Sequence, residues 1–130
     1  GIDPGVKTGF ATFDPLARKL TALTGSTHKI WESVKVLNKL YDVVVYIEDA
    51  RLRNWYGKQS KEKQQGAGAI KIQCTLWQQF LDDNEISYHL VAPKNTITKI
   101  TKEHFAFTTG FTARTSNHAR DAAMLVYGRK

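Results

Sequence analysis

The stretch VVVYIE, residues 43–48, constrains the fold of this chain more than any other part of the sequence. Its first five residues are apolar or aromatic and follow one another without interruption. Such a short continuous run is typical of a strand buried on both faces of a sheet, as in proteins that alternate strands and helices. The chain is therefore expected to cover both faces of its sheet.

Two long helices are expected on either side of this strand. In residues 27–40 apolar side chains recur at helical spacing, with Ser26 or Thr27 as the N-cap. Residues 66–82 carry two apolar stripes, which predicts a helix that contacts its own sheet and a second surface, either a partner or the last helix. The stripes are Ala67, Ile70, Cys74, Trp77 and Leu81, and beside them Ala69, Ile72, Leu76 and Phe80.

The remaining pattern predicts four more strands and two shorter helices. The strands are residues 1–3, 8–14, 18–25 and 86–91, and the helices are about 94–103 and 115–128, the last capped by Ser116 or Asn117. Strands first, then alternation of strand and helix, predicts an α/β fold. We expect a five-stranded mixed sheet, with three antiparallel strands and then two parallel ones, flanked by helices in a single domain over residues 1–130.

The composition fits a folded domain that attracts polyanions. Hydrophobic residues make up 42% of the chain, more than a disordered chain carries. Lysine and arginine number 19 against 12 acids, which gives a net charge of +7. No apolar run is long enough to span a membrane, and the single cysteine, Cys74, allows no internal disulfide. We therefore expect a protein of the reducing cytoplasm.

Three carboxylates occupy positions that are expected to meet at one edge of the sheet. Asp3 ends the first strand, Glu48 ends the buried strand, and Asp121 lies in the last helix. A carboxylate at the end of a core strand lies at the edge where α/β proteins bind ligands. Residues three apart share a helical face, so His118 and Asp121 can point to the same site. The sequence thus predicts Asp3, Glu48, His118 and Asp121 as catalytic, metal-binding residues.

This set of oxygen ligands suits magnesium-dependent hydrolysis of a phosphodiester. Two Mg²⁺ ions about 3.5–4 Å apart activate a water and neutralise the transition state. Magnesium prefers oxygen ligands and keeps several waters, so a few carboxylates are enough. Asp3, on the central strand, is expected to bridge two ions, and Mn²⁺ is expected to substitute. His118 either binds a metal or assists proton transfer.

Each of these residues also has an ordinary structural interpretation. An Asp-Pro-Gly sequence such as that beginning at Asp3 is common in turns. Glu48 could cap a neighbouring helix, and Asp121 suits the first turn of a helix because of the helix dipole. A single histidine such as His118 more often lies on the surface without a catalytic role. The joint order and placement of the residues favours a metal site.

A basic stretch with aromatic residues follows Glu48. Residues 51–65 hold five basic residues against one acid. Basic side chains interleaved with aromatic rings suit a surface that follows a nucleic-acid backbone and stacks an unpaired base, although Trp55 could instead pack in the core. The predicted DNA contacts here are Arg51, Arg53, Trp55, Tyr56, Lys58, Lys61 and Lys63.

Three motifs carry a resemblance to a known family. They are Gly1-Ile-Asp3-Pro-Gly5 followed by Thr8-Gly9, then Ile47-Glu48, and finally His118-Ala-x-Asp121-Ala122. In this order they resemble the motifs of RuvC-type Holliday-junction resolvases, over nearly the whole chain. The resemblance implies an RNase H-like fold, metal ligation by Asp3, Glu48 and Asp121, a homodimer, and paired nicks across a four-way DNA junction. His118 occupies a position that is His in some members and Asp in others.

Looser matches extend this resemblance. Gln65-Gly-Ala-Gly68 looks like the start of the family's dimer helix, which implies a homodimer through residues 66–82. Ala92-Pro-Lys94, with Lys99 and Lys102, looks like the family's basic segment, which implies DNA contacts and a scissile-phosphate contact for Lys94. The stretch after Glu48 departs from the family and suggests a divergent or phage-encoded member in a bacterial cell. A branch-migration helicase is a candidate partner.

Other functions compete with junction resolution. Another RNase H-like nuclease, acting on flap or branched DNA or on RNA–DNA hybrids, would use the same carboxylates. A catalytically silent junction-binding protein is disfavoured by the intact Asp3, Glu48 and Asp121. An actin-like ATPase also begins with Gly-Ile-Asp-x-Gly, but it needs two full domains and this chain is too short. We therefore expect a structure-specific endodeoxyribonuclease that resolves four-way junctions.

Overall fold

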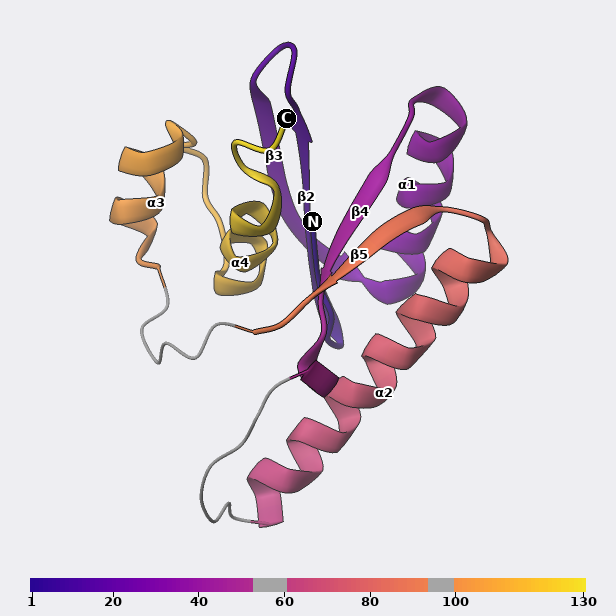
Figure 1. Cartoon of the computed structure of the whole chain (residues 1–130). Helices are drawn as coiled ribbons and strands as arrows, with labels where there is room; N and C mark the ends of the chain where they lie inside the picture. The colour runs from indigo at the N-terminus through magenta and orange to yellow at the C-terminus, as the bar shows by residue number, and fades with distance from the viewer. Residues whose placement is uncertain (53–60, 94–99) are drawn as a thin grey trace.

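Five strands form one mixed sheet in the computed structural model (Figure 1), in the order β3-β2-β1-β4-β5. The structure describes residues 1–52, 61–93 and 100–130, and of residues 61–67 it describes the backbone alone. The first three strands are antiparallel, and β4 runs parallel to both β1 and β5. The predicted mixed sheet is therefore confirmed. The strands are β1 (Ile2–Asp3), β2 (Lys7–Asp14), β3 (Lys19–Ser26), β4 (Val44–Glu48) and β5 (Ser87–Val91).

Helices cover both faces of this sheet. Figure 1 shows α1 and α2 on one side and α4, with α3 outside it, on the other. The short 3-10 turn η1 follows β4 directly. This layering agrees with the apolar run that precedes Glu48 in β4, which the sheet needs covered on both faces. The helices are α1 (Thr27–Leu40), η1 (Ala50–Leu52), α2 (Lys61–Asp83), α3 (Lys102–Thr109) and α4 (Asn117–Val126).

Each face of the sheet has its own hydrophobic core. The core under α1 and α2 contains Ile2, Phe10, Ile30, Val34, Val45, Ile47, Trp77, Leu81 and Ile86. The core under α3 and α4 contains Ala11, Phe105, Ala122, Ala123 and Val126. Successive residues of a strand point to opposite faces, so Phe10 enters the first core and Ala11 the second. Burying each large apolar side chain contributes about 1.5–3 kcal/mol, and the two cores fix the helices on the sheet from both sides.

Local capping sets the bounds of α3 and corrects the predicted helix near 94–103. The Thr101 side chain accepts a hydrogen bond from the backbone N–H of His104 at 3.1 Å, which starts the helix only at Lys102. Gly110, with φ 74°, adopts the left-handed conformation that ends it. The helix therefore begins near the end of the predicted range, while residues 94–99 lie outside the described part of the chain.

Helix α2 begins at Lys61, earlier than the predicted residue 66, and runs past the edge of the sheet (Figure 1). Cys74, Trp77 and Leu81 of the first predicted stripe are buried against the sheet. Of the second stripe, Phe80 stacks on Trp31, whereas the residues nearer the start of the helix are exposed. Within the described residues, no helix combines the length and apolarity needed to cross a membrane.

Candidate metal centre

Strand register places Asp3 and Glu48 side by side. Ile2 pairs with Ile47 in the parallel β1–β4 ladder, so the residues that follow them are neighbours at the carboxyl ends of the two strands. Both isoleucines are buried in the core under α1 and α2. Because side chains alternate along a strand, Asp3 and Glu48 belong to the opposite face, where α4 lies.

Helix α4 brings His118 to Asp3. The Nδ1 atom of His118 lies 2.9 Å from Oδ2 of Asp3, and the two side chains are 52% and 14% exposed. The helix begins here because the Ser116 hydroxyl accepts a hydrogen bond from the backbone N–H of Ala119 at 3.1 Å. Asp121 follows His118 by three residues, on the same side of the helix. The structure therefore joins the first and last of the predicted motifs directly.

A glycine allows this close approach of α4 to the sheet. Gly9 is the register partner of Asp3 in the β1–β2 ladder. A Cβ atom at Gly9 would overlap the backbone carbonyl oxygen of His118 and would lie 3.1 Å from Cβ of Asp3. The Gly9 of the Thr-Gly motif thus has a physical role, because any larger residue would push the helix that carries His118 away from Asp3.

Arg120, the variable position of the last motif, is a residue that the sequence pattern does not single out. It is buried, and its guanidinium donates to the carbonyl and hydroxyl oxygens of Thr115 at 2.8 and 3.0 Å and to the side-chain oxygen of Asn117. These bonds tie the segment before α4 to the helix itself. Arg120 therefore stabilises the turn that presents His118.

The donor set of this site suits a hard divalent cation. The carboxylates of Asp3, Glu48 and Asp121, with the imidazole of His118, are the groups that would hold it. Within the described residues, no group of three or more His, Cys, Asp or Glu side chains is gathered closely enough to hold an ion. The residues fit a metal by donor chemistry and by placement at one edge of the sheet.

Asp49, the acid next to Glu48, lies in a different environment. Its side chain is 1% exposed, and Arg51 donates to it from Nε at 2.8 Å and from a terminal guanidinium nitrogen at 2.7 Å. Burial acts to raise the pKa of the Asp49 carboxyl, but the hydrogen bonds and the charge of Arg51 outweigh it and hold the pKa below its ordinary value. The sequence predicts Arg51 as a DNA contact, whereas the structure gives its guanidinium internal partners.

The other predicted DNA contacts differ in how the structure places them. Lys102 is exposed at the first position of α3. Lys61 and Lys63 belong to the first turn of α2, and their side chains lie outside the described part. The predicted contacts that fall wholly outside the described residues are Arg53, Trp55, Tyr56, Lys58, Lys94 and Lys99.

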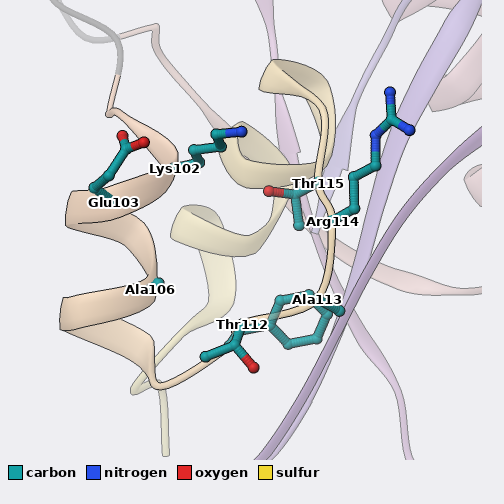
Figure 2. Close-up of a pocket in the computed structure, with 8 residues that line it drawn as sticks. Lys102, Glu103, Ala106, Thr112, Ala113, Arg114 and Thr115 are labelled. Atoms are coloured by element: carbon teal, nitrogen blue, oxygen red, sulfur yellow. The ribbon is translucent and has the colours of Figure 1, made fainter.

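A hollow of about 610 Å³ lies between α3 and the segment before α4, and Arg114 is one of its lining residues. Figure 2 shows Lys102 reaching from α3 toward the segment that carries Thr115, with Glu103 directed the other way. Lys102, Thr112, Arg114 and Thr115 are among the residues that line the hollow, and in Figure 2 the Arg114 guanidinium points away from α3. Arg114 lies four residues before His118, a closeness in sequence that could have identified it.

Comparison with known proteins establishes the fold. No family model matches this chain, and no curated protein matches its sequence. Among solved structures, the chain is similar to T. thermophilus RuvC in complex with a Holliday junction substrate, with a TM-score of 0.59 and 16% sequence identity, over 98% of this chain and 88% of that chain. The chain therefore has the RNase H-like fold of RuvC, as the motifs predicted.

Proposed function

We propose that residues 1–130 form a nuclease domain that nicks four-way DNA junctions with the help of divalent metal ions. The observation that carries this proposal is the contact between His118 and Asp3, beside Glu48 in strand register. This contact lies at the carboxyl ends of the parallel strands β1 and β4, and α/β proteins bind ligands at that edge of the sheet. The likeness to a RuvC that is bound to a Holliday junction supports the choice of substrate.

The residues of the site divide the chemistry between them. Asp3, Glu48 and Asp121 offer the oxygens that would hold Mg²⁺ or Mn²⁺. When bound, two such ions would supply positive charge for the pentacovalent phosphate and lower the pKa of the attacking water. His118 faces Asp3 through Nδ1 and is half exposed, so it can exchange protons with solvent as well as offer a nitrogen ligand.

Basic residues around the hollow beside α3 are suited to the DNA backbone. Lys102 and Arg114 line it together, and a phosphate oxygen accepts hydrogen bonds from both types of side chain. The net charge of +7 favours the approach of DNA, a polyanion. We extend the proposed DNA surface to Lys94, for the scissile phosphate, and to the basic residues of 53–65 with Lys99.

The exposed side of α2 supports a two-fold homodimer. Ile72 and Leu76 are four residues apart, so they share a helical face, and they are 62% and 40% exposed. A Cβ atom at Gly68 would meet nothing within 4 Å, which leaves room for the close approach of a second helix. A second copy of this chain is the occupant we propose, because a two-fold dimer presents two identical sites to a symmetric junction.

Incubation with a synthetic mobile four-way junction tests this function. With Mg²⁺ or Mn²⁺ present, we expect paired nicks at symmetric positions. Asp3→Asn and Glu48→Gln should abolish the nicks while junction binding is retained. Asp42→Asn and Glu32→Gln are matched controls, because both residues are exposed and lie away from α4. Full activity in Asp3→Asn would show that the site is misassigned.

The choice of substrate separates the competing functions. A nuclease for flaps or RNA–DNA hybrids would cut those substrates, or linear duplex, as well as the four-way junction, and that result would exclude a resolvase. A silent junction-binding protein would bind the junction without nicking it under any divalent ion. A cytoplasmic location, a phage origin and a helicase partner stay predictions from the sequence and its resemblance.

A further inference from the structure

Two consecutive acids leave the end of β4 toward opposite faces of the sheet. Glu48 belongs to the face of α4, by alternation from the buried Ile47. Asp49 is the next residue, so its side chain points to the other face of the sheet, where α2 lies. There its buried carboxylate binds Arg51, which also contacts Gln78 of α2. Of these two neighbouring acids, Glu48 therefore belongs to the candidate metal centre, and Asp49 forms an internal ion pair with Arg51.

The backbone around Glu48 is held from two neighbouring elements. The N–H of Asp49 donates to the carbonyl oxygen of Val91 on β5 at 2.8 Å, which continues the ladder one residue beyond the strand. The thiol of Cys74 on α2 lies 3.7 Å from the carbonyl oxygen of Glu48. The N–H of Leu52 donates to the carbonyl oxygen of Asp49 at 3.0 Å, which closes the turn of η1.

Arg51 links this turn to α2 and β5 through side chains. One terminal nitrogen of its guanidinium donates to Asp49 and, at 2.6 Å, to the side-chain oxygen of Gln78. The other terminal nitrogen lies 3.3 Å from the hydroxyl of Thr75. Gln78 in turn donates to the hydroxyl of Tyr88 on β5 at 3.0 Å. The chain just after Glu48 is thus tied to the helix and to the neighbouring strand by one continuous network.

We propose that Asp49 and Arg51 are positioning residues that set the placement of Glu48 at the candidate metal centre. This inference rests on the proposed function and assigns a role to the stretch in which this chain departs most from the family it resembles. In this role the two residues act through the backbone of Glu48 and not by contact with substrate or metal. They fix the direction in which the chain leaves β4, and therefore the direction of the Glu48 side chain one residue earlier.

The geometry of the pair makes Arg51→Lys the informative substitution. A guanidinium donates to a carboxylate through two nitrogens and still reaches Gln78, whereas an ammonium keeps the charge but loses the fork. The substitution would therefore keep the net charge of the surface and the electrostatic attraction for DNA. Only the rigid connection between η1 and α2 would be lost.

Calorimetric titration of the full chain with Mn²⁺, without DNA, measures this effect. We expect Arg51→Lys to weaken Mn²⁺ binding by about tenfold or more, as for other changes in groups that orient metal ligands. The Mg²⁺ concentration that gives half-maximal junction nicking should rise with it, while the rate at saturating Mg²⁺ and the junction affinity stay near those of the unmodified protein. Asp49→Asn should act in the same direction. Arg18→Lys, in the exposed β2–β3 hairpin, is the matched control.

Other results would overturn the proposal. A lower melting temperature with unchanged Mn²⁺ affinity would mean that the pair only stabilises the fold. Weaker junction binding with unchanged Mn²⁺ affinity would make Arg51 a DNA contact. A double variant tests whether Arg51 acts on metal binding through Glu48. In the Glu48→Gln protein, Arg51→Lys should cause no further loss of Mn²⁺ affinity. A further loss of the same size as in the unmodified protein would contradict an effect through Glu48.

Failure of this inference is distinguishable from failure of the proposed function. The Mn²⁺ titration needs no nucleic acid, so it yields a result even if the protein cuts no four-way junction. If no junction is nicked but Arg51→Lys still weakens Mn²⁺ binding, the positioning role stands and the substrate is wrong. If junctions are nicked normally and Mn²⁺ affinity is unaffected, the positioning role is wrong and the function stands.

Discussion

The imidazole Nδ1 of His118 lies 2.9 Å from Oδ2 of Asp3, across 115 positions of sequence. This contact brings the first strand of the chain and its last helix to one point at the edge of the sheet. Glu48 adjoins that point through the parallel register of β1 and β4. The predictions below test the contact, the packing that permits it, and the surfaces around it.

Replacement of His118 tests its part in the chemistry. We expect His118→Ala to slow junction nicking by about 100-fold or more, because proton transfer by a positioned side chain contributes roughly 10²–10⁴-fold. His118→Asp should keep much of the metal-dependent rate, because a carboxylate can also bind the metal or accept a proton. Single-turnover nicking at saturating Mg²⁺ measures both variants. Nicking by His118→Ala at the unmodified rate would remove His118 from the site.

Replacement of Gly9 tests the close packing of α4. Gly9→Ala adds a methyl group where the carbonyl oxygen of His118 already lies, and we expect a loss of about 1–3 kcal/mol in the free energy of unfolding together with slower nicking. Gly25→Ala, on the adjacent strand, is the comparison, because its Cβ would meet side-chain atoms of Ile30, at 3.1 and 3.6 Å, and no backbone atom, so we expect a smaller loss. Urea denaturation compares the two. Equal stability of the two variants would contradict the packing argument.

A charge on the exposed side of α2 tests the dimer. We expect Leu76→Asp to convert a dimer into a monomer with little change in melting temperature, because Leu76 is exposed within one copy of the chain. Val36→Asp places the same charge on the exposed side of α1 and should leave the dimer intact. Sedimentation equilibrium at micromolar concentration distinguishes the two states. An unmodified protein that sediments only as a monomer would exclude α2 as a dimer interface.

Arg114 and Lys102 test the proposed DNA surface. If each contacts a backbone phosphate, then Arg114→Ala and Lys102→Ala should each weaken junction binding on all sequences and reduce the slope of log affinity against log salt by about 1. Lys29→Ala, on the exposed side of α1, should change neither quantity. Fluorescence anisotropy with a labelled junction, measured at several salt concentrations, gives the slopes. An unchanged slope for Arg114→Ala would exclude the hollow beside α3 as a phosphate site.

The layers of the fold were predictable from the sequence, because they follow from patterns of apolar side chains within short segments of the chain. The apolar run of 43–48 predicted a strand with both faces covered, and the structure places helices on both sides of β4. Of the helix predicted near 94–103, residues 94–99 lie outside the described part of the chain, and the described helix α3 has bounds set by single capping interactions at Thr101 and Gly110. The capping hydrogen bond at Thr101 and the left-handed conformation of Gly110 do not change the spacing of apolar residues, so that spacing does not reveal where the helix begins and ends.

For the candidate site, the residue types and their order along the chain were readable without a structure. Asp3 and Glu48 end predicted strands, and alternation assigns each a face once the buried positions are known. The basic stretch after Glu48 predicted Arg51 as a DNA contact, which stays a prediction. Its bonds to Asp49 and to Gln78 on α2 are known only from the folded arrangement.

What the sequence determined by itself is therefore the order of elements, the apolar faces and the carboxylates at strand ends, because each depends on residues close together in the chain. What the tertiary structure decided is which distant groups meet: His118 with Asp3, and Arg51 with Gln78. Such contacts depend on how closely two elements can pack, as the absence of a side chain at Gly9 illustrates. That closeness is a property of both surfaces together and is encoded in neither segment alone.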